Sequence, residues 1–217
     1  YTLEELKENL KEKQTDKDGK LVVLYAGNKE AQHSYIEIAK EKGYEVLLLD
    51  SPIISHLIQK LESDNKDLTF VRVDSDHIDN LIKKEENAIS KLSDEEKESL
   101  KSVLETIVPK QTYTVQLEAL DSSASPFIIT QPEFLRRMKE MSKMGGGNAM
   151  MFGDFPEKIN LVVNTNHPIG QKILNADDAA KNTLAKQLTD LALLSQGMLK
   201  GADLTNFVER SINLVTE

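Results

Sequence analysis

Leu21-Val-Val-Leu-Tyr-Ala26 is a continuous apolar run, and a second run, Glu45-Val-Leu-Leu-Leu-Asp50, follows it after a helical segment. Continuous apolar runs of this length are typical of strands that are covered on both faces of a sheet. Residues 29–42 and 51–61 have helical patterns, and Leu68-Thr-Phe-Val-Arg-Val73 is a third strand candidate. The order β-α-β-α-β predicts a small α/β unit with a three-stranded parallel sheet and helical crossovers.

The pattern changes to α+β after Pro109. Ser93-Asp-Glu-Glu96 is a capping box that predicts the start of a charged helix before this point. Beyond it, strands are expected at 113–118, 126–130 and 158–164, and helices from Pro132, at about 177–196 and at about 203–215. We therefore expect an α/β subdomain at residues 1–85, a helical connector at 86–110, and an α+β domain at 111–217 that ends in a helical hairpin.

Composition excludes several classes of protein. The 217 residues carry a formal net charge of −9 and contain no cysteine. An acidic balance argues against a nucleic-acid binder, which normally presents a basic face. Without cysteine there is no disulfide scaffold, no Cys-ligated zinc and no thiol catalysis. No apolar run approaches the roughly 18–20 residues of a membrane helix. We expect no nucleic-acid or membrane partner, and because Tyr1 stands in place of Met, we expect a piece of a longer protein.

The sequence contains no recognisable catalytic or metal-binding motif. The histidines are widely separated and lack the spacing that would place two metal ligands on one helix face: His33, His56, His77 and His167. The Gly-Asn pair after the first strand lacks the further glycines of a phosphate-binding loop. We therefore predict no catalytic residue and no metal site. A small ligand at the carboxyl ends of the parallel strands stays an open alternative.

Methionine is concentrated in one place, since five of the six methionines lie between Met138 and Met151. In the helix from Pro132, for which Thr130 and Glu133 predict a capping box, an apolar stripe consists of Phe134, Leu135, Met138 and Met141. Such a stripe fits either a core helix or an exposed protein-binding surface. The adaptable methionine side chains and the glycine-rich run that follows favour the exposed surface.

The two closing helices carry further apolar rows. In the first they are Leu184, Leu188, Leu191 and Leu194, and in the second Leu204, Phe207, Val208, Ile212 and Val215. Two amphipathic helices joined by a short turn form a hairpin. The hairpin can fold onto its own domain or pair with a second copy as a four-helix bundle, and the pattern leaves both open.

Taken together, these motifs resemble the heat-shock protein 90 family of chaperones in its bacterial form, high-temperature protein G (HtpG). The matching stretches are Tyr1-Thr-Leu-Glu-Glu-Leu-Lys-Glu-Asn-Leu10, Val23-Leu-Tyr-Ala-Gly27, Lys42-Gly-Tyr-Glu-Val-Leu-Leu-Leu49, Asp121-Ser-Ser-Ala-Ser-Pro126, Leu161-Val-Val-Asn-Thr-Asn-His-Pro168, Leu191-Ala-Leu-Leu-Ser-Gln-Gly197 and Asn206-Phe-Val-Glu-Arg210. They span essentially the whole chain in the family's order.

This resemblance implies a homodimeric, ATP-dependent chaperone of the cytoplasm. Residues 1–85 would be the end of the middle domain, and residues from about 110 would be the C-terminal dimerization domain. The ATP and Mg site of the family lies in a domain outside this chain. The resemblance therefore implies no catalytic residue and no cofactor for this part, with unfolded client proteins and a second copy of the chain as partners.

The resemblance also implies two sets of site residues. Client binding would involve Phe134, Leu135, Met138 and Met141, which correspond by position to the family's client-contacting helix. Proximity to that helix, and not a family position, adds Met144, Met150, Met151 and Phe152 to the predicted set. The dimer interface would involve Leu184, Leu188, Leu191, Leu194, Leu204, Phe207, Val208 and Ile212. The alternatives are a noncatalytic dimeric adaptor and a small-ligand-binding α/β domain.

Overall fold

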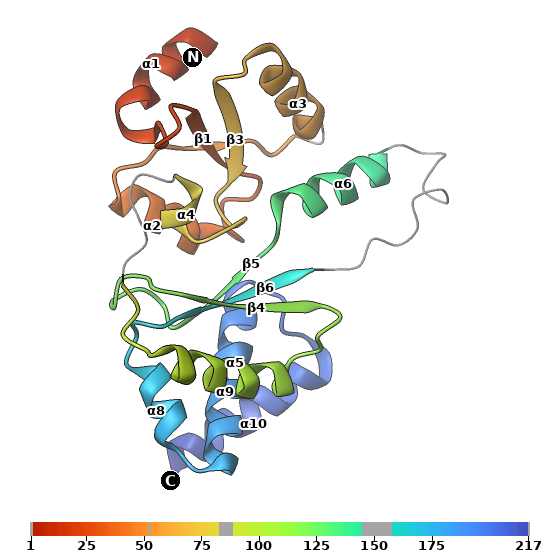
Figure 1. Ribbon diagram of the computed structural model, residues 1–217. Coiled ribbons are helices and arrows are strands. Elements are labelled where there is room, and N and C mark those ends of the chain that lie inside the picture. Colours follow the sequence, from red (N-terminus) through yellow and green to blue (C-terminus); the bar gives the residue numbers. More distant parts are fainter. Residues whose placement is uncertain (1, 52, 83–88, 145–157, 217) are drawn as a thin grey trace. The chain divides into compact units, whose positions relative to one another are not determined.

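The computed structural model describes residues 2–51, 53–82, 89–144 and 158–216, with residues 139–144 and 216 described by their backbone only. The chain forms two compact units (Figure 1). Unit 1 comprises residues 1–86 and 131–156, and unit 2 comprises residues 87–130 and 157–217. The chain therefore leaves unit 2 at residue 131, enters unit 1, and returns.

Unit 1 is the predicted parallel α/β unit. Its described strands are β1 (Leu21–Ala26), β2 (Val46–Leu48) and β3 (Leu68–Arg72), and its described helices are α1 (Leu3–Gln14), α2 (His33–Glu41), α3 (Ile54–Asp64), α4 (Ile78–Leu81) and α6 (Glu133–Met144). The strand order is β2-β1-β3, and both pairings are parallel. The prediction of a three-stranded parallel sheet is confirmed.

The central strand β1 explains the continuous apolar run. All six of its residues are buried, because the strand has a neighbour on each side and chain covering each face. The α1–α3 side of the sheet packs Tyr25 and Phe70 against Leu10 and Ile58. After α2, Gly43 has a φ of 76°, so it supplies the left-handed residue expected just past a helix end.

Unit 2 is the predicted α+β unit. Its described elements are α5 (Asp94–Ile107), β4 (Tyr113–Glu118), β5 (Phe127–Thr130), β6 (Ile159–Asn164), α8 (Ile169–Asn175), α9 (Asp178–Ser195) and α10 (Gly201–Thr216). The strand order is β4-β6-β5, in which β6 runs parallel to β4 and antiparallel to β5. The closing hairpin that the sequence predicts is present as α9 and α10.

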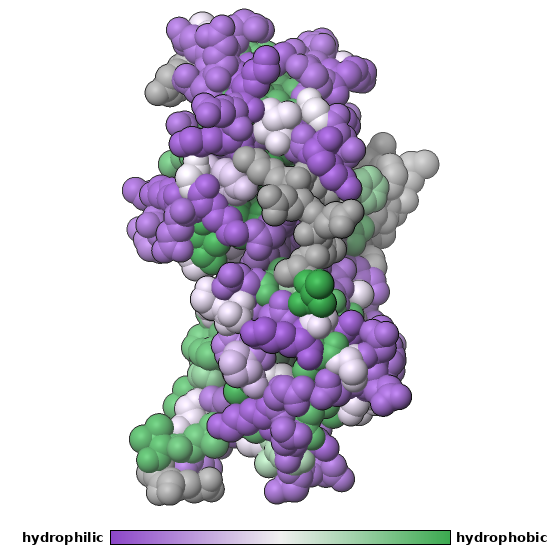
Figure 2. Space-filling view, turned by 60° about the vertical axis from the view of Figure 1, so that its left-hand side comes forward, coloured by the Kyte–Doolittle hydropathy of each residue, from purple (hydrophilic) through white to green (hydrophobic). Residues whose placement is uncertain are grey.

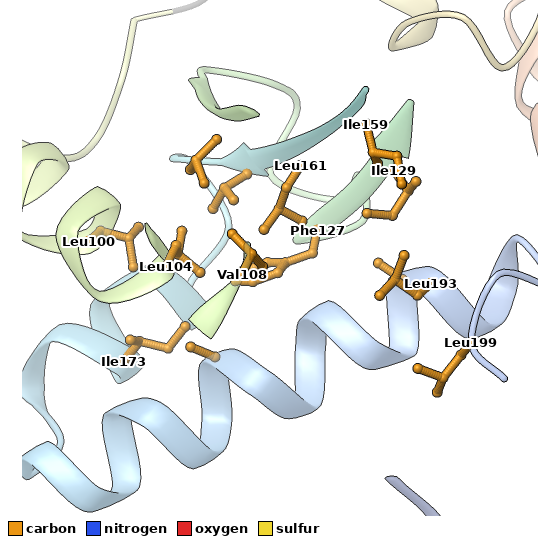
Figure 3. Packing of buried hydrophobic residues seen from close by; sticks show 14 of the residues in the cluster. Leu100, Leu104, Val108, Phe127, Ile129, Ile159, Leu161, Ile173, Leu193 and Leu199 are labelled. Carbon is orange, nitrogen blue, oxygen red and sulfur yellow. The ribbon is translucent and has the colours of Figure 1, made fainter. Parts of the chain in front are cut away.

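The core of unit 2 lies between this mixed sheet and its helices (Figure 3). Leu161 of β6 is fully buried, and the labelled side chains of the strands point toward those of Leu104, Ile173 and Leu193 on α5, α8 and α9. A buried leucine contributes roughly 1.5–3 kcal/mol to folding. The capping box predicted for α5 is present, since Ser93 Oγ accepts from Glu96 N and the Glu96 carboxylate accepts from Ser93 N.

The division into units differs from the expected boundaries at two helices. Residues 94–107 were expected in a connector, but α5 packs in the core of unit 2. Helix α6 groups with unit 1, although 111–217 were expected as one domain. The capping box at Thr130 is absent: Thr130 belongs to β5, and its buried hydroxyl has no hydrogen-bond partner among the described residues. The helix begins at Glu133, and Pro132 O accepts its first bond from Arg136 N.

The side chains of Asn164 and Asn166, within one of the family-like motifs, hold the loops of unit 2 together. Asn164 accepts from Leu120 N and donates to Asp121 O at 2.7 Å. Asn166 accepts from Lys91 N at 2.7 Å and donates to the carbonyls of Leu120 and Ile89 at 3.0 and 3.2 Å. Both side chains are buried, so they satisfy backbone groups that would otherwise lack partners.

Asn166→Ala should lower the free energy of unfolding by roughly 1–3 kcal/mol, because it leaves the Lys91 N–H and two carbonyls without their partner. Urea unfolding measures the change. Asn182→Ala, on the exposed surface of α9, is the control and should cause no loss. Equal stability of Asn166→Ala and the wild type would contradict this role.

Candidate interaction surfaces

The α9–α10 hairpin divides the predicted interface residues into two groups. Phe207 lies in the core of unit 2, and Leu184, Leu188 and Leu204 are partly buried against that core. The exposed group is Leu191, Leu194, Val208 and Ile212, with exposed fractions of 38–57%. The hairpin thus folds onto its own unit through one side and leaves a second apolar side in solvent.

A buried carboxylate fixes the pairing of the two helices. Asp190 of α9 has no exposed surface. Its carboxylate oxygens accept from the ammonium group of Lys186 at 2.6 Å and from the guanidinium group of Arg210 on α10. Gln187 donates to Ser211 Oγ at 2.7 Å. A buried charge with two cationic partners constrains both distance and register, because any slip would leave it unpaired. The apolar sides of α9 and α10 are therefore held in a defined orientation.

The exposed side of α10 contains an open apolar groove of about 360 Å³. It is lined by Phe207, Val208, Ser211, Ile212 and Val215. Figure 2 shows hydrophobic residues gathered over the last turns of α10. Val215, which is 86% exposed, was not assigned to the interface from sequence, although it falls seven residues after Val208 on the same helix face.

Helix α6 carries the predicted client-binding stripe. Phe134 is 70% exposed, and Leu135 and Met138 are half-buried. Met141 and Met144 lie on the described backbone of the helix, but their side chains fall outside the described residues. Met150, Met151 and Phe152 lie outside the described residues altogether. The structure therefore describes the side chains of Phe134, Leu135 and Met138, and it places the Phe134 ring in solvent.

The polar side of α6 faces unit 1. Glu133 accepts from Tyr25 Oη at 2.8 Å and from Arg137 Nε at 2.7 Å. Arg136 donates to Glu133 at 2.6 Å and also contacts the Tyr25 hydroxyl. Arg137 reaches Glu62 of α3 at 2.9 Å. The sequence analysis missed this cluster. Tyr25 lies 108 residues before Glu133, and Glu62 lies 75 residues before Arg137, so no local pattern joins them to α6.

Burial and charge shape the titration of this cluster. Burial by itself would raise the pKa of Glu133, but hydrogen bonds and charge from Arg136 and Arg137 outweigh it, so that its pKa lies below the ordinary value. Burial, and then the nearby Glu133 charge, raise the pKa of Tyr25 far above its ordinary value. At neutral pH the carboxylate is therefore ionised and the phenol keeps the proton that it donates.

In the part of the chain that the structure describes, no group of three or more His, Asp or Glu side chains could hold a metal ion. No helix among those residues is both long and apolar enough to cross a membrane. Among the described residues, large apolar side chains are exposed on α6, at Phe134, and in a row along α10. Exposed apolar surfaces are typical of proteins that bind other proteins.

The comparisons with known proteins identify the family. A family model described as Hsp90 protein matches residues 2–217, so the chain belongs to the Hsp90 family. The chaperone protein HtpG of Bacteroides thetaiotaomicron is 34% identical over 99% of this chain. HtpG of Porphyromonas gingivalis is 41% identical over 88% of it, and HtpG of Alkalilimnicola ehrlichii is 30% identical over 93%.

The chain is shorter than these relatives. It spans 41% of the Bacteroides protein, 28% of the Porphyromonas protein and 31% of the Alkalilimnicola protein. The resemblance to a bacterial Hsp90-family chaperone is thereby confirmed, and this chain corresponds to only a portion of each relative.

Arg210→Ala should destabilise the hairpin by roughly 1–3 kcal/mol, because the buried Asp190 carboxylate would keep only Lys186 as a cationic partner. Thermal unfolding at one fixed protein concentration measures the loss. Lys200→Ala removes an exposed cation close to the same hairpin and should leave the melting temperature unchanged. A melting temperature for Arg210→Ala equal to that of the wild type would show that the ion pair does not hold α10.

Proposed function

We propose that this chain is the part of an Hsp90-family chaperone that joins two protomers and contributes to the surface that contacts unfolded client proteins. Membership of the family and the HtpG relatives support the chaperone role. The observation that carries the proposal is the presence of two separate exposed apolar surfaces, on the α9–α10 hairpin and on α6. Each surface takes one of the two roles.

The hairpin surface suits a second copy of the chain. Val208, Ile212 and Val215 recur at i, i+4 and i+7 on α10, and Leu191 and Leu194 recur at i and i+3 on α9. Two helices with such rows can pair with their symmetry copies in a four-helix bundle. The rigid pairing through Asp190 supports this role, because a preorganised surface loses less conformational entropy on association.

The α6 surface suits a partner without a fixed shape. Phe134 projects an aromatic ring into solvent, and Met138 follows one turn later on the helix. Methionine side chains adapt to different apolar partners, and aromatic rings contribute strongly at protein interfaces. Exposed unfolded segments offer apolar side chains in varied arrangements, which such a surface can accept.

Nucleotide chemistry is not assigned to this chain. Under the proposal, ATP and Mg bind in another part of the longer protein. The two units described above respond to the conformational change that ATP causes there and do not themselves hydrolyse ATP. A cytoplasmic location, which the family resemblance implies, stays a prediction.

Replacing Leu191 and Ile212 together by aspartate should convert the chain from dimer to monomer in analytical ultracentrifugation at micromolar concentration. Both side chains are already exposed, at 51% and 57%, so the helical content measured by circular dichroism should be retained. The interface would instead bury two unpaired carboxylates per protomer.

The matched control for this experiment is Ile89→Asp. Ile89 belongs to unit 2 and is 91% exposed, yet it lies outside the hairpin. The control should stay dimeric. A monomeric wild-type chain, or an aspartate double variant that stays dimeric, would contradict the hairpin interface.

Phe134→Ser should weaken suppression of aggregation of a denatured model substrate several-fold. The ring is largely exposed, so stability should change by no more than about 0.5 kcal/mol. Ile53→Ser, at a position of unit 1 that is 63% exposed, is the matched control and should suppress aggregation like the wild type. Equal suppression by Phe134→Ser and the wild type would favour a dimeric adaptor without client contact.

A further inference from the structure

Helix α6 has an unusual orientation for an amphipathic helix. Its charged side chains are turned inward: Arg136 is 8% exposed, Glu133 19% and Arg137 21%. Phe134, on the apolar stripe, is 70% exposed. A surface helix normally buries its apolar side and exposes its charges. In α6, polar contacts therefore replace much of the apolar packing that usually holds a helix in place.

Arg137 is the centre of these contacts. Its guanidinium donates to Glu133 on α6 at 2.7 Å, to Glu62 on α3 at 2.9 Å, and to the carbonyl of Phe70 on β3. One planar side chain thus joins two helices and a strand. Only arginine presents several fixed donors that can reach acceptors on three elements together.

The acceptor on α3 is itself held in place. Glu62 accepts from the backbone N–H of Phe70 at 2.7 Å and from the hydroxyl of Thr69 at 3.3 Å. Its carboxylate is therefore attached to β3 whether or not α6 is present. Arg137 binds to a preformed acceptor site, made by Glu62 and the Phe70 carbonyl, on the surface of the parallel sheet unit.

An α6 helix without this anchor would be marginal. The helix has 12 residues, and isolated helices of about this length are barely stable in water. The spacing of Phe134, Leu135 and Met138 along one side exists only while the helix is formed. Loss of the anchor would therefore unfold α6, so that these three side chains no longer lie along one side, and would also detach the segment from α3 and β3.

We propose that Arg137 is a positioning residue for the client-binding surface: it anchors α6 to α3 and β3 by its polar side, and so keeps the apolar stripe helical with Phe134 exposed. This inference rests on the proposed function of α6 in client contact. It assigns to Arg137 no contact with the client. The partly buried acceptors also make the anchor less sensitive to salt than an exposed ion pair.

The test compares hydrogen exchange and client binding in Arg137→Ala. Amides of residues 133–144 should exchange at least about tenfold faster, and binding of a denatured model substrate should weaken roughly three- to tenfold, because the client must then order the helix. Amides of β1, whose residues are all buried, should keep their protection. The protection of the β1 amides reports whether unit 1 is still folded.

Two further variants make the comparison specific. Lys60→Ala removes a cation from α3 whose ion pair with Asp64 is exposed, and it should change neither measurement. Arg137→Lys keeps the charge but loses the planar guanidinium group with its several donors. The α6 amides should therefore exchange at rates between those of the wild type and Arg137→Ala.

Unchanged exchange at α6 in Arg137→Ala would overturn the anchor. Faster exchange with undiminished client binding would also overturn it, provided that Phe134→Ser still weakens binding. If neither Phe134→Ser nor Arg137→Ala alters client binding while exchange at α6 rises, the proposed client surface has failed and the anchor alone stands. Loss of β1 protection in Arg137→Ala would contradict a positioning role, since Arg137 would then hold unit 1 as a whole.

Discussion

The ion pairs of Arg137 with Glu62 and Glu133 determine which side of α6 meets solvent. Charges that are largely removed from water must be paired, so the helix has little freedom to turn its polar side outward. On its apolar side Phe134 is exposed as the consequence, and Leu135 and Met138 stay half-buried. The proposed contact with unfolded proteins depends on this inversion, because a helix packed by its apolar stripe would have no such surface to offer.

The closing hairpin uses a related arrangement for a different purpose. Asp190 is completely buried between α9 and α10 and is paired with Lys186 and Arg210. The apolar residues on one side of the hairpin complete the core of unit 2, and those on the other side are left in solvent. In both units a buried charge sets the orientation of a helix, and the exposed apolar surface follows from that orientation.

Local patterns predicted most elements of the fold. The apolar run of β1 identified a central strand, and Ser93 with Glu96 correctly identified the start of α5. Thr130 with Glu133 had the same capping pattern, but β5 extends through Thr130, and Glu133 binds Tyr25 and the two arginines instead. Tertiary pairing competes with local capping for the same side chains, and a short motif cannot reveal that competition.

The sequence by itself determined the parallel sheet of unit 1, the α+β pattern of unit 2, the closing hairpin and the family, because each depends on periodicity or on stretches that are read along the chain. Only the tertiary structure decided which unit contains α5 and α6, and which apolar side chains of the hairpin are exposed. The physical reason is distance along the chain. Arg137 and its acceptor Glu62 are separated by 75 residues, so their pairing, and the orientation of α6 that it sets, exist only once unit 1 has folded.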